Sequence, residues 1–216
     1  MEVIYLDNHL LAVNKKAGIA TQELPQSHEA SSESLEEIAK KWLKEKYRKP
    51  GKVFLEPIHR IDRPVSGLVL FARTGKALSR LQAAMREKQI HKTYYALVEG
   101  ALPSEEGTLE HYLVHDEFRA RVASLKEKDA KLARLHFKVK NQKKGMALVE
   151  IVLETGRYHQ IRAQFAAIGC PIIGDRKYGS KKAWKKDEIA LHHGRLEFPH
   201  PVKEEKLILE VIHLFS

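Results

Sequence analysis

The feature that most constrains the fold is a succession of short strand-like segments with few helices between them. Residues 90–98 (IHKTYYALV) alternate as a strand does, so Lys92, Tyr94 and Ala96 share one side. Runs of strands without a helix after each one favour an α+β fold over a doubly wound sheet. We therefore predict a mixed, mostly antiparallel β-sheet core with flanking helices and loops, in a single domain over residues 1–216.

The expected strands are short apolar or alternating runs bounded by turn residues. They cover residues 3–6, 10–14, 67–72, 90–98, 108–114, 119–125, 132–140, 146–153, 190–198 and 206–213. Asn141 to Gly145 fits a hairpin connection, and the polar residues 22–33 fit a surface loop.

Three helices are expected. Ser34 and Glu37 have capping-box spacing ahead of an apolar stripe, which predicts the first. Thr74 can cap the second. The third covers about 158–168 and ends at Gly169.

A net charge of +10 and a pI near 9.5 suggest a polyanionic partner, because contacts to phosphates release condensed counterions. The lysines are spread along the chain, and each local cluster also fits a solvated face or turn. These clusters are Lys40, Lys41, Lys44 and Lys46; Lys143 and Lys144; and Lys181, Lys182, Lys185 and Lys186. Their sum favours RNA binding more than any one cluster does.

Several classes of protein are excluded by what the sequence lacks. No apolar run approaches the roughly 20 residues that span a bilayer, and the first residues do not form a signal peptide. The only cysteine, Cys170, excludes an intramolecular disulfide and multi-cysteine metal sites. The twelve histidines show no HExxH or Cys/His spacing. We expect a cytoplasmic monomer with no membrane contact, metal or cofactor.

Three polar segments carry chemistry. In the first, HRIDRPVSG, Asp62 stands between Arg60 and Arg63, whose positive charge favours an ionised carboxylate. A carboxylate nucleophile needs that state. A structural Asp–Arg turn ahead of a strand is the alternative.

The second segment, GRYHQIR, begins the third expected helix. Its N-terminal amides favour anions, and Arg162 adds a fixed cation one turn in; a capped helix with one surface arginine is the alternative. The third, KTYYALV, offers Tyr94 as a ring for base stacking and as a phenol for proton transfer. A strand tyrosine that only packs is the alternative.

Five segments match a set of family motifs in order, from about residue 3 to 213: DNHLLAVNKKAGIATQ, HRIDRPVSGLVLFAR, KTYYALVEG, TGRYHQIRAQFAAIGCPIIGDRKYG and LHHGRLEFPHP. They resemble DxxLLVVNKPAG, HRLDxxTSGLLLFAK, KxYxALVxG, GRTHQIRVHLAxxGxPIxGDxxYG and LHAxxLxFxHP of the RluA-like RNA pseudouridine synthases. The resemblance implies the pseudouridine synthase fold. It covers the catalytic domain alone, without the S4-type RNA-binding domain that many relatives carry.

The resemblance also implies roles. Asp62 matches the catalytic aspartate, Tyr94 the active-site tyrosine, and Arg162 the arginine that pairs with the aspartate. Arg60 matches an arginine that can fill the space left by a flipped nucleotide. The other residues of these motifs that we expect to contact RNA are His59, Arg63, Lys92, Arg157, His159 and Gln160.

The expected activity is isomerisation of a specific uridine in structured RNA, ribosomal or transfer, after the base is flipped out. Val65 and Tyr158 stand where the family usually has threonine, which implies changed substrate contacts or packing.

One alternative is an RNA-binding or ribosome-assembly protein on the same fold without catalysis; the intact catalytic trio argues against it. A second is a nucleoside or glycoside hydrolase, which commonly needs a second carboxylate, and the matched motifs contain none.

Overall fold

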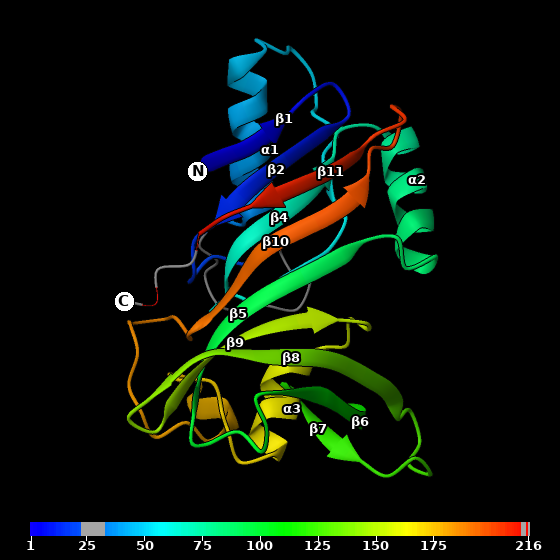
Figure 1. Ribbon diagram of the computed structural model, residues 1–216. Helices are drawn as coiled ribbons and strands as arrows, with labels where there is room; N and C mark the ends of the chain where they lie inside the picture. Colours follow the sequence, from blue (N-terminus) through cyan, green and yellow to red (C-terminus); the bar gives the residue numbers. More distant parts are fainter. Residues whose placement is uncertain (23–32, 213–214, 216) are drawn as a thin grey trace. The chain divides into compact units, whose positions relative to one another are not determined.

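The computed structural model of the protein describes residues 1–22, 33–212 and 215. They form two compact units (Figure 1). The first unit combines Met1–Ile90 with His193–Ile212, and the second is built on His91–His192. The expectation of a single domain over the whole chain stays a prediction.

The described residues of the first unit form strands around a buried centre. Its elements are β1 (Glu2–Leu6), β2 (Leu10–Lys15), β3 (Glu56–Pro57), β4 (Ser66–Ala72), β10 (Leu191–Pro199) and β11 (Lys206–Glu210), with α1 (Leu35–Lys46) and α2 (Gly75–Arg86). The strand order is β1-β2-β4-β10, with β3 also beside β4 and β11 beside β10. Strand β4 thus lies inside the sheet, and its residues 67–72 are buried on both faces, as its apolar run predicts.

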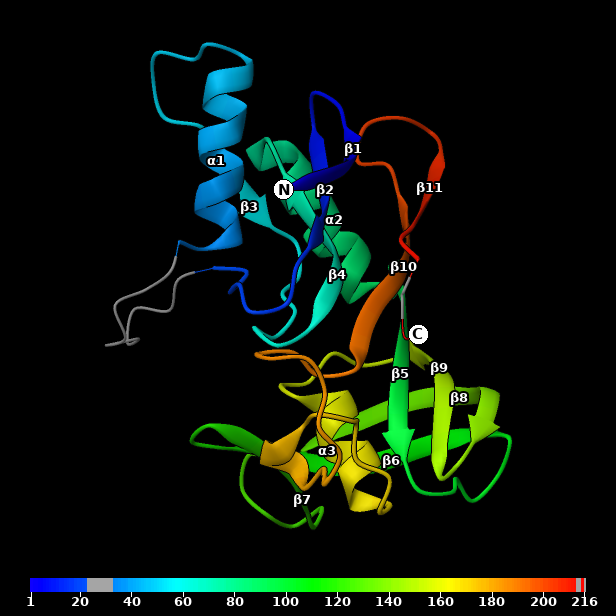
Figure 2. The ribbon, with the colours of Figure 1, turned by 90° about the vertical axis from the view of Figure 1, so that its left-hand side faces the viewer.

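The helices of this unit begin where the sequence signals predict. Ser34 caps α1 through a complete capping box with Glu37, and Thr74 caps α2 by accepting the N–H of Ala77. From α2, Leu81 and Ala84 enter a core cluster with residues of β2, β4 and β10. The helix and these strands are seen in Figure 2. This packing fixes the sheet from which the loop before β4 projects.

The described residues of the second unit form an antiparallel sheet with one α-helix. Its elements are β5 (His91–Glu99), β6 (Glu106–Asp116), β7 (Arg119–Ala123), β8 (Lys131–Lys143), β9 (Met146–Leu153), α3 (Gln160–Ala167) and the 3₁₀ helix η1 (Arg176–Tyr178). The strand order is β5-β9-β8-β6-β7. Helix α3 is joined to this sheet by the buried Gln164, whose side-chain amide donates to the carbonyls of Leu109 and Ala133 at 3.0 and 3.2 Å.

The α+β prediction is confirmed, and several predicted boundaries are wrong for identifiable reasons. The hairpin predicted at Asn141–Gly145 is only the turn Lys144-Gly145, because both residues have positive φ while the preceding three extend β8. Helix α3 begins at Gln160 rather than 158, because His159 has φ +49° and stops the helix there.

Other differences concern short or terminal elements. Strand β11 ends at Glu210, short of the predicted residue 213, which lies outside the described residues. Residues 23–32 of the predicted surface loop also lie outside them. Strand β3 and η1 were not predicted, because two or three residues carry no periodic signal.

Gly67 generates a prediction about stability. It has φ +118°, and a Cβ there would overlap the carbonyl of His193 and lie 2.6 Å from that residue's backbone nitrogen. Gly67→Ala should therefore lower the free energy of unfolding by about 3 kcal/mol or more. Urea unfolding measures this. Gly51→Ala is the control, because Gly51 has nothing within 4 Å; its change should stay within about 0.5 kcal/mol. Equal effects of the two substitutions would contradict the prediction.

Candidate active site

Asp62 lies in the first unit, in the loop between β3 and β4. The loop turns at Asp62, whose carbonyl accepts the N–H of Val65 at 3.0 Å. Thr21 holds the preceding residue, the buried Ile61: its hydroxyl donates to the Ile61 carbonyl at 3.0 Å and accepts the Ile61 N–H at 3.3 Å. The Asp62 side chain remains half-buried on a backbone that is fixed on both sides.

A buried ammonium ties this loop to the segment after β2. Lys15 is 0% exposed, and its Nζ donates to the carbonyls of Lys16 at 3.1 Å, Ile19 at 2.7 Å and Arg63 at 3.2 Å. Gly18 and Arg63 add two further bonds, from the Gly18 N–H to the Arg63 carbonyl and from Arg63 Nε to the Gly18 carbonyl. Because a buried charge requires such partners, Lys15 positions the residue that follows Asp62.

His59 serves as a second fixed point of the loop. It is 9% exposed, and its Nε2 accepts the Leu70 N–H at 3.3 Å, so this nitrogen is unprotonated. Its ring meets the ring of His193 edge-on, with centroids 5.1 Å apart. This burial gives His59 a role in orienting the loop, and its predicted RNA contact stays a prediction.

Arg162, in the second unit, is held by a buried carboxylate. Its Nε and Nη2 donate to the two oxygens of Asp175 at 2.6 and 2.9 Å, and both side chains are at most 6% exposed. The guanidinium also lies 4.9 Å from the centroid of the Tyr178 ring. A bidentate pair of this kind fixes the plane of the guanidinium as well as its charge.

The third nitrogen of Arg162 determines the protonation state of His159. Arg162 Nη1 lies 2.9 Å from His159 Nε2, and since arginine can only donate, Nε2 must be the acceptor. The ring proton therefore sits on Nδ1 and is donated to the Tyr178 oxygen, 2.9 Å away. Burial, and then the positive charge of Arg162, lower the pKa of His159 to about 3. His159 is thus a neutral link between Tyr178 and Arg162.

Lys92 and Tyr94 project from the same side of β5, as the alternation predicts. Tyr94 is 7% exposed. The Lys92 ammonium passes over Gly156, where a Cβ would lie 3.3 Å from Nζ, so glycine leaves room for it. Burial lowers the pKa of Lys92.

Gln160 and Arg157 differ in accessibility. The buried Gln160 side chain accepts the N–H of Arg157 at 3.0 Å and the hydroxyl of Thr155 at 2.8 Å, and donates to the Arg134 carbonyl at 3.1 Å. It therefore closes the turn before α3. Arg157 is exposed, with Nε bonded to the Leu132 carbonyl at 2.9 Å.

Each unit contains some of the site residues that were predicted from the sequence. The first contains His59, Arg60, Asp62 and Arg63; the second contains Lys92, Tyr94, Arg157, His159, Gln160 and Arg162. Sequence reasoning missed Lys15, Asp175 and Tyr178, although all three stand inside the matched motifs NKKAG and GDRKYG. A lysine at the end of a run that begins with four apolar residues, LLAVNK, was the available signal for Lys15.

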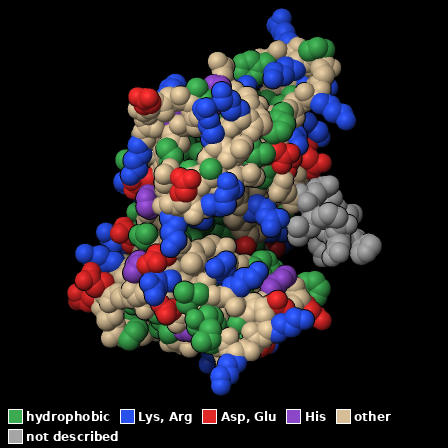
Figure 3. Space-filling view, turned by 90° about the vertical axis from the view of Figure 1, so that its right-hand side faces the viewer, with side chains coloured by type: hydrophobic (Ala, Val, Ile, Leu, Met, Phe, Trp, Pro, Cys, Tyr) green, Lys and Arg blue, Asp and Glu red, His purple; other side chains and the backbone are tan. Residues whose placement is uncertain are grey.

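The basic charge is distributed over both units. Figure 3 shows Lys and Arg side chains scattered across the face in view instead of gathered in one patch. In the described part of the chain, no group of three or more His, Cys, Asp or Glu side chains could hold a metal ion, and no helix is long and apolar enough to cross a membrane.

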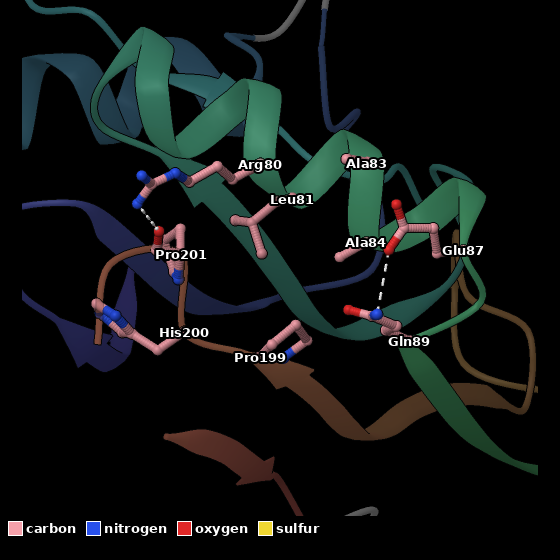
Figure 4. A pocket seen from close by; sticks show the side chains of 9 residues that line it. All are labelled: Arg80, Leu81, Ala83, Ala84, Glu87, Gln89, Pro199, His200 and Pro201. Carbon is pink, nitrogen blue, oxygen red and sulfur yellow. Dashed lines mark hydrogen bonds between the residues drawn. The ribbon is translucent and has the colours of Figure 1, made fainter. Parts of the chain in front are cut away.

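A pocket of about 260 Å³ in the first unit does not involve the predicted residues (Figure 4). It lies under α2, where Arg80 donates to the Pro201 carbonyl at 2.5 Å. Its lining consists of Arg80, Leu81, Ala83, Ala84, Glu87, Gln89, Pro199, His200 and Pro201. The candidate site therefore consists of the motif residues described above, around Asp62 and Arg162, and does not include this pocket.

Comparison with known proteins gives a consistent result. Residues 9–167 match the family model described as RNA pseudouridylate synthase. A Bacillus subtilis protein named as an uncharacterized RNA pseudouridine synthase, YhcT, is 32% identical over 97% of this chain and 68% of its own length. The ribosomal large subunit pseudouridine synthase C of Buchnera aphidicola subsp. Schizaphis graminum is 34% identical over 95% of this chain and 65% of its length. The chain thus spans about two thirds of these relatives.

One solved structure supports the same fold. Human RNA Pseudouridylate Synthase Domain Containing 4 superposes with a TM-score of 0.81 at 19% identity, covering 99% of this chain and 89% of that chain. The pseudouridine synthase fold predicted from the motifs is confirmed.

The buried Arg162–Asp175 pair generates a prediction about stability. Asp175→Asn should lower the free energy of unfolding by about 3 kcal/mol or more, because it leaves a buried guanidinium without its counter-charge. Glu110→Gln is the matched control: it removes the partner of Arg134 in a pair whose side chains are 41% and 47% exposed. The control should cost about 1 kcal/mol or less. Comparable losses in urea unfolding would contradict this account.

The neutral state of His159 can be observed directly. Its folded-state pKa of about 3 lies below the ordinary 6.5, so it contributes stability above pH 6.5 that is lost as the pH falls toward 3. Long-range ¹H–¹⁵N spectra, assigned with His159→Gln, should keep an Nδ1-protonated neutral ring from pH 8 to about pH 4. A ring that titrates near pH 6.5 would exclude the proposed bond from Arg162.

Proposed function

Because the chain belongs to the RNA pseudouridylate synthase family, we propose that it isomerises a specific uridine in structured RNA to pseudouridine, with Asp62 as the nucleophile. The anchored Asp62 loop carries the proposal. Lys15 and Thr21 fix the backbone on either side of Asp62 while its carboxyl group stays half-buried. A nucleophile held in this way loses little orientational freedom when the substrate binds.

The reaction conserves every atom of the substrate. The target uridine is flipped out of the RNA, which costs a few kcal/mol of unstacking and least in a loop. Asp62 then promotes cleavage of the C1′–N1 bond, either by attack on C1′ or by removal of the C2′ proton to give a glycal; both routes use an ionised carboxylate. The uracil turns and C5 bonds to C1′. On the first route this breaks the Asp62–C1′ ester bond, and on the second C2′ regains its proton. The C5 proton leaves to a base, and N1 gains a proton.

The remaining roles follow from the residues of the second unit. We assign Tyr94, nearly buried on β5, to proton transfer at C5, and Arg162 to stabilising negative charge during the reaction. The bidentate bonds that Arg162 donates to Asp175 orient its guanidinium for that role. Arg60 and Arg63 are assigned to the RNA, with Arg60 filling the space of the flipped nucleotide.

The name of one relative suggests where to look for the substrate. The Buchnera protein is named as acting on the ribosomal large subunit, so the large-subunit ribosomal RNA is the first substrate to test and transfer RNA the second. We further propose that the protein acts as a monomer in the cytoplasm.

The decisive measurement is turnover of the Asp62→Asn variant. With large-subunit RNA carrying tritium at uridine C5, label release should fall at least about a thousandfold, because the variant lacks the nucleophile. RNA affinity should stay within about threefold, since phosphate contacts dominate it.

Asp129→Asn is the matched control, since Asp129 is exposed in a turn at φ +63°, a conformation that asparagine tolerates. It should release tritium as the unmodified chain does. Near-normal release from Asp62→Asn would refute the nucleophile. RNA binding without release by the unmodified chain, on both RNA classes, would instead favour the non-catalytic RNA-binding protein.

A further inference from the structure

We propose that Phe118, at the tip of the β6–β7 hairpin, is a platform on which one unpaired base of the RNA stacks. This inference rests on the proposed function, since it assigns a contact to the same RNA. It concerns a residue outside all the sequence motifs discussed above and lies wholly within the second unit.

The exposure of Phe118 has no structural benefit for the hairpin. Its side chain is 73% exposed, more than any other aromatic side chain among residues 1–22, 33–212 and 215. The strands pair up to Asp116 and Arg119, so Glu117 and Phe118 form a two-residue turn in which Glu117 has φ +43°. Glycine or asparagine suits such a turn better. A strained glutamate is costly for folding, and its place at the turn that presents the Phe118 ring fits a binding role for this tip.

Hydrogen bonds to the backbone fix the hairpin tip that carries the Phe118 ring. The Phe118 carbonyl accepts the Lys177 ammonium at 3.0 Å and the Tyr158 hydroxyl at 3.4 Å. Two residues beyond Phe118, the Ala120 N–H donates to the Tyr178 oxygen at 2.7 Å. These bonds join the hairpin to the start of α3 and to η1, so the ring projects from a supported backbone.

The hairpin is also connected to the predicted catalytic arginine. The Tyr158 ring stacks on His159, with centroids 3.9 Å apart and planes at 17°, and meets His115 edge-on at 4.3 Å. His159 in turn bonds to Arg162. Tyr158 replaces the threonine usual in the family, so this aromatic link to the tip is a departure of this chain from the family motif.

The charges around the ring favour a nucleic acid over an apolar partner. Lys177 and Arg119 are exposed; Arg119 lies 3.7 Å from Asp116 with its side chain 58% exposed, and Lys177 bonds to a neutral carbonyl. Arg121, by contrast, is paired with Glu127, and Glu117 adds a negative charge at the turn. One solvated ring beside accessible cations fits base stacking with a phosphate contact. A protein interface would require a much larger apolar area.

The test measures binding of a fluorescein-labelled 12-nucleotide oligouridine by anisotropy at fixed salt. Phe118→Ala should weaken binding about tenfold through loss of stacking, and Phe118→Tyr should restore the affinity to within about twofold, since it keeps the ring. Phe54→Ala is the matched control, since Phe54 is a 45%-exposed phenylalanine of the first unit; it should bind as the unmodified chain does. Equal affinities of Phe118→Ala and the unmodified chain would overturn the platform.

Two further measurements separate stacking from charge and from folding. Phe118→Ala should leave the dependence of log affinity on log salt unchanged, whereas Lys177→Gln should lower its slope by about 0.7, the value for one single-strand phosphate contact. In Phe118→Trp, the oligonucleotide should quench the new indole beyond any change from the two native tryptophans. Absence of added quenching would contradict stacking even if Phe118→Ala were misfolded.

The outcome is distinguishable from that of the proposed function. Loss of affinity in Phe118→Ala, with no tritium release from any RNA by the unmodified chain, would retain the platform and refute the isomerase. Tritium release by the unmodified chain, with Phe118→Ala binding normally, would retain the isomerase and refute the platform.

Discussion

The buried guanidinium of Arg162 is the constraint around which the second unit is organised. A charge at 6% side-chain exposure needs bonded partners, and three of those of Arg162 are Asp175, Tyr178 and His159. Two of these partners have a second role. Tyr178 accepts the Ala120 N–H of β7, and His159 directly precedes the first residue of the helix that carries Arg162. The chemistry proposed for Arg162 and the packing of α3 on the sheet therefore depend on the same contacts.

The first unit also contains a buried cation, and its partners there are backbone carbonyls. Lys15 terminates a fully buried strand, and its ammonium is satisfied by the loop that follows it and by Arg63. The same bonds fix Arg63, the residue after Asp62. A buried cation that binds carbonyls thus connects the packing of strand β2 to the position of the Asp62 loop.

How much could be predicted depended on how local each signal is. The alternation of residues 90–98 and the capping box of Ser34 involve near neighbours in sequence, and both were predicted correctly. The start of α3 was not, because His159 is held at positive φ where its ring bonds to Tyr178, nineteen positions away. Arg162 was assigned a partner from the motifs; its buried bond to Asp175 depends on the folded turn after α3.

The sequence by itself determined the family, the α+β class and the identity of Asp62, Tyr94 and Arg162 as the residues to test, because these follow from motif order and strand periodicity. Only the tertiary structure decided which groups bond to the charges of Lys15 and Arg162 and which aromatic ring is left in solvent. The partners and the exposure of a side chain are set by what surrounds it in space. Those surroundings come from segments distant in the chain, whose approach no local pattern encodes.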